Sequence, residues 1–133
     1  MLEYVLVRAC AVEKVEDLET FLIALFDNPE NPVQGIEIQV SLNEPDEQDK
    51  ELGMDGYCLC LMSGATFYGG LSSCILRGNN LTLELSDEAV AVSGVEGFFF
   101  QLELSEKQTV SLKAGLERMF KNVPRAPTHL ILE

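Results

Sequence analysis

The sequence predicts an α+β fold: an antiparallel sheet of about seven strands, with one long C-terminal helix and one short helix packed on it. Three observations support this prediction. Segments with the two-residue alternation of strands fill most of the chain before Ser105, the strongest helical period follows Ser105, and apolar residues make up 47% of the 133. A chain of this length and composition can bury a core, so we expect residues 1–133 to form a single domain.

The first third of the chain predicts three strands. Residues 3–12 are rich in valine and partly alternate, while residues 34–42 place their large aliphatic side chains on one face only. Residues 15–27 fit either a helix or a strand. We favour a strand over 19–26, because two Asn-Pro pairs mark a turn directly after it.

The middle of the chain predicts a loop followed by two strands. Residues 44–55 are acidic and read as the loop. Residues 56–62 have apolar side chains on both faces, which predicts a central strand, and residues 66–77 form the next one. Gly69 and Gly70 lie inside this last segment, where paired glycines indicate a bulge or a close approach by another backbone.

The last part of the chain alternates strands and helices. Ser86 caps a short helix, and a capping box of Ser105 and Gln108 starts the longer one. Phe99 faces away from its two phenylalanine neighbours, so it belongs either to a strand covered on both sides or to an exposed anchor for a partner. The expected elements are strands at 81–85 and 98–104 and helices at 87–93 and 105–122, and the tail 128–133 could add a last short strand.

The net charge of −13 excludes several classes of partner. Phosphate repels so acidic a chain, which argues against direct binding of nucleic acid, and an anionic membrane repels it too. No apolar run reaches the roughly 20 residues of a membrane helix, and we see no basic leader of a signal peptide. We therefore expect a cytoplasmic protein.

The charge is also unevenly distributed. Residues 1–66 hold 14 acids and 3 bases, and residues 67–133 hold 8 acids and 6 bases. The densest stretch is 44–55, with six acids and one lysine. It is either a solvated connection or an electrostatic patch that steers a basic partner.

The sequence contains no recognisable catalytic or metal-binding set. Its one histidine, His129, has no positioned nucleophile or acid beside it in sequence. The four cysteines lack metal-ligand spacing and read as small half-buried apolar residues. The spacing of the acids in residues 44–55 does not match that of an EF-hand calcium loop. We expect no enzyme activity, no metal and no cofactor.

Several segments together resemble the immunity protein 10 family of bacterial polymorphic toxin systems. The resemblance starts with Asp46–Cys58 and continues through Gly64–Leu71. It extends to Leu81–Ala89 and to the helical run Gly115–Phe120. It covers roughly residues 20–121, and none of its motifs is catalytic.

This resemblance implies a protein that binds a cognate toxin domain and blocks its active site or substrate path. A toxin that acts on nucleic acid is usually basic, so an acidic inhibitor would complement it. The alternative is a domain that binds a small ligand, with the strand of Gly69 and Gly70 lining a cavity. The chain is expected to be a monomer or a homodimer. The residues expected to face the toxin are Glu44, Asp46, Glu47, Asp49, Glu51, Asp55, Tyr57 and Tyr68.

Overall fold

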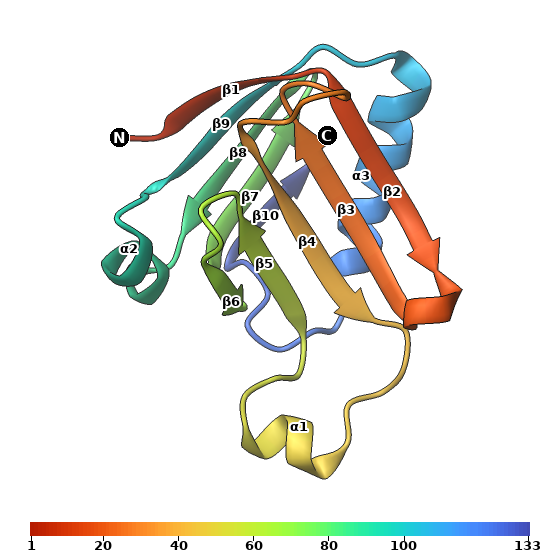
Figure 1. Cartoon of the computed structure of the whole chain (residues 1–133), viewed down its shortest axis with the longest axis vertical. Coiled ribbons are helices and arrows are strands. Elements are labelled where there is room, and N and C mark those ends of the chain that lie inside the picture. Colours follow the sequence, from red (N-terminus) through yellow and green to blue (C-terminus); the bar gives the residue numbers. More distant parts are fainter.

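The computed structural model describes all 133 residues and contains two five-stranded sheets and three α-helices (Figure 1). Sheet A comprises, in spatial order, β1 (Glu3–Val7), β9 (Gly97–Leu102), β8 (Asn80–Leu85), β7 (Leu71–Arg77) and β10 (His129–Leu132). Sheet B comprises β2 (Ala9–Val15), β3 (Thr20–Phe26), β4 (Gly35–Ser41), β5 (Tyr57–Leu61) and β6 (Thr66–Tyr68). The helices are α1 (Glu47–Glu51), α2 (Asp87–Ser93) and α3 (Glu106–Met119).

The α+β class is confirmed, but the prediction of one antiparallel sheet of about seven strands is wrong. Sheet B is antiparallel throughout. Sheet A is mixed, because β1 joins β9 in parallel and β10 joins β7 in parallel. These pairings bring Val5 beside Phe100 and Leu130 beside Cys74. The long helix is not C-terminal either, since the tail returns after it to form β10.

The chain passes between the two sheets at two points, and each divides a segment that was predicted as one strand. Arg8 separates β1 from β2, and its amide donates to Phe26 O at 3.0 Å. Gly69 and Gly70 separate β6 from β7, with φ of 92° and 96° that side chains rarely tolerate. The chain therefore passes from sheet B to sheet A at the glycine pair. The β-bulge lies just beyond it, between Leu71 and Ser73.

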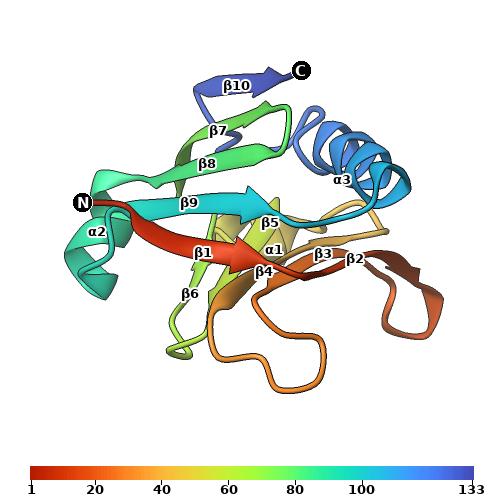
Figure 2. The ribbon, with the colours of Figure 1, turned by 90° about the horizontal axis from the view of Figure 1, so that it is seen from above.

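One cluster of 24 buried residues fills the space between the sheets. Figure 2 shows the two sheets as separate layers, with α3 beside them on the inner side of β2 and β3. Gly115 permits this close approach: a Cβ there would lie 2.7 Å from Val12 Cγ1. Sheet A and α3 thus together cover the inner face of sheet B.

Most local predictions are confirmed. The ambiguous region is a strand, β3, and the alternating segment after it is β4. Gly94 ends α2 in the left-handed conformation after the Ser86 cap. The helix that starts at Ser105 ends at Phe120, slightly before the predicted Asn122. No helix combines the length and the apolar character that crossing a lipid bilayer requires.

Replacing Ser105 by alanine is expected to lower the free energy of unfolding by about 1 kcal/mol. The Ser105 hydroxyl accepts from Gln108 N at 3.1 Å, and this half of the capping box is lost, whereas the Gln108 side chain can still accept from the backbone N–H of residue 105. Urea unfolding measures the loss. Ser111→Ala, on an exposed position of the same helix, is the control and should not destabilise the protein.

Candidate functional site

The acidic segment, residues 44–55, contains α1 and is not the continuous loop that was predicted. Asp46 caps this short helix, and its carboxylate accepts from Asp49 N at 2.8 Å. Glu47 and Asp49 lie in the first turn, where negative charge is favourable, and Lys50 lies in the last. An Asp followed at once by acidic residues is a helix-start signal that could have been found in the sequence.

Arg125 lies in the connection between α3 and β10 and forms hydrogen bonds with the end of the acidic segment. Its guanidinium donates to Gly53 O at 3.2 Å and to both the backbone oxygen and the carboxylate of Asp55, the latter at 3.1 Å. Gly69 makes room for this side chain, because a Cβ at that position would lie 2.9 Å from Arg125 Cβ. No sequence pattern singles out Arg125, since its partners lie about 70 residues earlier in the chain.

The hydrogen bond from Arg125 is the main reason that the pKa of Asp55 lies below its usual value. A lowered folded-state pKa means that ionised Asp55 stabilises the fold above its unfolded pKa of about 4, and that this contribution disappears as pH falls through the folded pKa. Asp55→Asn is therefore expected to lower stability at pH 7, with a difference from the native chain that closes below pH about 4.

Urea unfolding of the native chain and Asp55→Asn between pH 3 and pH 7 tests this expectation. Glu51→Gln is the matched control: Glu51 is exposed and has no cation within 4 Å, so its neutralisation should not destabilise the fold. An equal loss of unfolding free energy in both variants would contradict a specific stabilisation of Asp55 by Arg125.

The structure brings most of the predicted residues to one surface. Four of the acids are exposed and Asp49 is half-buried. Asp55 faces Arg125 with its side chain 14% exposed, so its charge is already neutralised within the chain. Tyr68 is 42% exposed on β6, beyond the end of the acidic segment. The four exposed acids are Glu44, Asp46, Glu47 and Glu51.

The prediction that Tyr57 faces the toxin is wrong, because its side chain is fully buried. It lies on the inner face of β5, where its ring packs edge-on against Phe120 at 5.1 Å between ring centres. Its hydroxyl accepts from Leu71 N at 3.1 Å and donates to Arg125 O at 2.9 Å. Tyr57 therefore joins the two sheets and the Arg125 connection.

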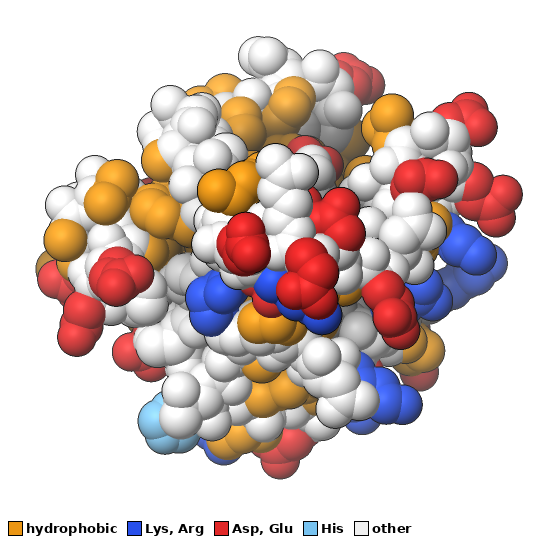
Figure 3. All heavy atoms as spheres, turned by 90° about the horizontal axis from the view of Figure 1, so that it is seen from below, with side chains coloured by type: hydrophobic (Ala, Val, Ile, Leu, Met, Phe, Trp, Pro, Cys, Tyr) orange, Lys and Arg blue, Asp and Glu red, His pale blue; other side chains and the backbone are white.

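Hollows lie on both sides of the acidic segment. A groove of about 260 Å³ separates it from β4, β5 and β6, and Asp49, Cys58 and Tyr68 all line it. A second, of about 460 Å³, lies between the segment and the residues that follow α3. In the view of Figure 3 the acids gather at the centre of the face where α1 projects. The segment is thus a raised acidic ridge beside sheet B.

Sheet B and its connections carry nearly all of the excess charge. Residues 9–68 contain 13 acids and 2 bases. Only two of these acids form ion pairs, Glu16 with Lys14 and Asp55 with Arg125, so eleven carboxylates have no cation within 4 Å. Carboxylates gathered in this way repel one another and attract a cationic partner.

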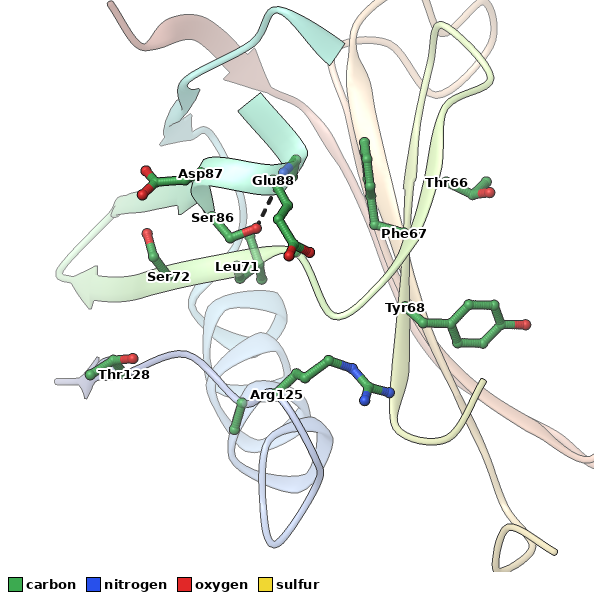
Figure 4. A pocket seen from close by; sticks show the side chains of 13 residues that line it. Thr66, Phe67, Tyr68, Leu71, Ser72, Ser86, Asp87, Glu88, Arg125 and Thr128 are labelled. Carbon is green, nitrogen blue, oxygen red and sulfur yellow. Dashed lines mark hydrogen bonds between the residues drawn. The ribbon is translucent and has the colours of Figure 1, made fainter. Parts of the chain in front are cut away.

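The cleft beside Gly70 is the one that the small-ligand alternative would use. It has a volume of about 610 Å³ and lies between β6, the start of α2 and Arg125 (Figure 4). Several polar groups in it already have partners within the chain: Ser72 donates to carbonyls of β8, Ser86 caps α2, and Arg125 binds Asp55. Asp87, Glu88 and Thr128 also line the cleft (Figure 4) and form no side-chain hydrogen bond within the chain, so its polar lining is only partly paired.

A family model described as Immunity protein 10 matches residues 6–110. This chain belongs to the immunity protein 10 family. Membership implies a non-catalytic protein that binds and neutralises a cognate toxin. The match to this family spans all of sheet B and the acidic segment, whereas Arg125 and β10 lie outside it. No curated protein and no solved structure matches the chain significantly.

Proposed function

We propose that this chain neutralises its toxin through the acidic segment, and that the toxin is a basic domain such as a nuclease acting in the cytoplasm. The observation that carries the proposal is the set of eleven carboxylates on sheet B and its connections that have no cation of their own chain within 4 Å. A domain that grips phosphate presents Lys and Arg to it, and the same side chains can pair with carboxylates.

The immunity protein would neutralise the toxin by occupying its phosphate-binding site. Carboxylates that lie against the phosphate-binding cations of a nuclease compete with the nucleic acid for them, so the bound inhibitor closes the substrate path. The ridge shape supports this, because the acidic segment projects from the sheet and can enter a concave basic site. No chemistry by the immunity protein is needed.

Calorimetry with the toxin domain encoded directly upstream tests the proposal. We expect a dissociation constant below about 1 µM at low salt, weakening steadily as ionic strength rises, because exposed charge pairs are screened. Light scattering on the mixture gives the stoichiometry. No binding at low salt would remove the proposal, and a thermal-shift response to a metabolite without any protein partner would favour the small-ligand alternative.

A further inference from the structure

The outer face of sheet B is uncovered by any other element. Its inner face packs against the core between the sheets and against α3, and in Figure 1 the opposite face of β2 to β5 is turned to the viewer with no helix across it. Figure 2 agrees, since sheet A and α3 both lie on the same side of sheet B. The acidic segment lies at the lower end of this outer face (Figure 1).

The strand register places the outward side chains in two rows across the five strands. At the centre of each row an acid or amide on β4 lies beside a cysteine on β5, Gln39 with Cys58 and Glu37 with Cys60. The first row is Glu13, Leu22, Gln39, Cys58 and Tyr68. The second row is Ala11, Ala24, Glu37, Cys60 and Thr66.

These rows have the composition of a binding surface for a basic partner. Apolar and thiol side chains of β3 and β5 lie on either side of the polar Gln39 and Glu37 of β4, and Tyr68 supplies an aromatic ring at one end. Two carboxylates, Glu13 and Glu37, stand among them with no cation within 4 Å, and Glu37 accepts only from Gln39, at 2.9 Å. Apolar contact area combined with polar groups is usual in a protein–protein interface.

The dimensions support joining the sheet face to the acidic segment. Five strands are about 24 Å wide and a seven-residue strand is about 23 Å long, so the face covers roughly 500 Å². A standard interface needs roughly 800 Å² per partner, which the face alone does not reach. The groove shared by Asp49, Cys58 and Tyr68 makes the face continuous with the acidic segment, which supplies the remaining area.

The outer face of sheet A is the rival surface, and its charges distinguish it. It carries an apolar row that includes Tyr4 stacked on Phe99 at 6.1 Å, so Phe99 lies on an uncovered face. Its charges are more nearly balanced: Arg77 pairs with Glu133 at 2.6 Å, and Glu84, which accepts from Ser73 at 3.2 Å, has no cation within 4 Å. A cationic partner gains less there than at sheet B, where Glu13, Glu37 and the adjoining acidic segment supply more carboxylates without a cation.

We propose that the outer face of sheet B is the centre of the toxin-binding surface and that the acidic segment is its rim. The occupant is a basic face of the toxin, with apolar side chains over Cys58 and Tyr68 and Lys or Arg side chains reaching Glu13 and Glu37. This inference rests on the proposed function, and deepens it by placing the contact on one of two exposed sheet faces.

A pair of matched lysine substitutions tests the placement. Gln39 and Thr82 are both half-buried, and each lies on the outer face of the central strand of its sheet. Gln39→Lys should weaken toxin binding by about tenfold or more, because it puts a cation at the centre of the contact. Thr82→Lys makes an equal change in net charge and should weaken binding by less than about twofold. Circular dichroism checks that both variants fold.

Thiol alkylation gives a second readout without substitution. Cys58 and Cys60 are half-buried on the proposed surface, whereas Cys74 is fully buried and serves as the internal control. Burial, and then the adjacent Cys58 thiol, raises the pKa of Cys60 to about 12, so Cys60 should react slowly and Cys58 is chosen as the reporter. Bound toxin should protect Cys58 from a maleimide, read by mass spectrometry of its peptide.

The outcomes separate the two proposals. A tight complex in which Cys58 reacts as fast as in the free chain, and in which Gln39→Lys binds as Thr82→Lys does, would overturn the placement and leave the proposed function standing. Strong weakening by Thr82→Lys alone would assign the contact to sheet A. The absence of any complex at low salt would remove the proposed function and this inference with it.

Discussion

Reversing Glu44, Glu47 and Glu51 to lysine is expected to slow association with the toxin by roughly 10- to 100-fold and to leave the fold intact. All three side chains are exposed and none has a cation within 4 Å, so no internal contact is lost. Asp46 and Asp55 are left unchanged because they hold the cap of α1 and the contact with Arg125. Stopped-flow mixing at low salt measures the rate.

A second triple variant removes the effect of total charge. Glu3, Glu88 and Glu117 are exposed, have no cation within 4 Å and lie outside sheet B. Their reversal also changes the net charge from −13 to −7, but away from the acidic segment. We expect this variant to slow association much less, and both rates should converge with that of the native chain in high salt. Equal slowing in the two variants would mean that the acidic segment acts only through bulk charge.

Local signals in the sequence were sufficient for most secondary structure, because they depend on neighbouring residues. The Ser86 and Ser105 caps, and the alternation over β4, are made by side chains within a few residues of one another. The division into two sheets has no such signal. Every strand of either sheet turns apolar side chains inward, so the alternation is the same and does not identify the partner strand.

The partner strands are decided by contacts between distant parts of the chain. Pairing of β1 with β9 joins Val5 to Phe100, and neither segment carries information about the other. Arg8 and the pair Gly69 and Gly70 change the sheet within what looks like one extended run. Only the glycine pair could have suggested the change, since two successive positive φ angles are incompatible with a continuous strand.

The candidate site was partly predictable for a similar reason. Solvation keeps a dense run of carboxylates at the surface, so the exposure of Glu44, Glu47 and Glu51 follows from composition. Tyr57 alternates with Leu59 and Leu61, but the other face of this segment is apolar too, so the alternation did not show which face is the inner one. Arg125 was not predictable, because a lone base after a helix shows nothing of the acid that it will contact.

Replacing Tyr57 by phenylalanine is expected to lower the free energy of unfolding by about 1–3 kcal/mol. The ring would remain against Phe120, but the buried Leu71 N–H would lose its acceptor and Arg125 O its donor. Tyr68→Phe is the matched control, because Tyr68 is 42% exposed and no hydrogen bond of its hydroxyl would be lost; we expect less than about 0.5 kcal/mol there. Urea unfolding at pH 7 gives both values.

The pH dependence of this difference identifies its cause. Burial raises the pKa of Tyr57 to about 12. A raised folded-state pKa means that the stability from the protonated hydroxyl is fully present below the unfolded pKa of about 10 and is lost as pH rises towards the folded value. The advantage of the native chain over Tyr57→Phe should therefore shrink between pH about 10 and about 12.

Toxin binding by Tyr57→Phe then separates a structural role from a contact role. At temperatures well below unfolding, a chain whose hydroxyl only joins the two sheets should bind the toxin as tightly as the native chain, because Tyr57 is fully buried. Truncating Tyr68 to alanine should do the reverse, weakening binding by about tenfold while stability changes little, since an aromatic ring at an interface is a common anchor. Weakened binding by a fully folded Tyr57→Phe would instead extend the contact, through Arg125, to the connection between α3 and β10.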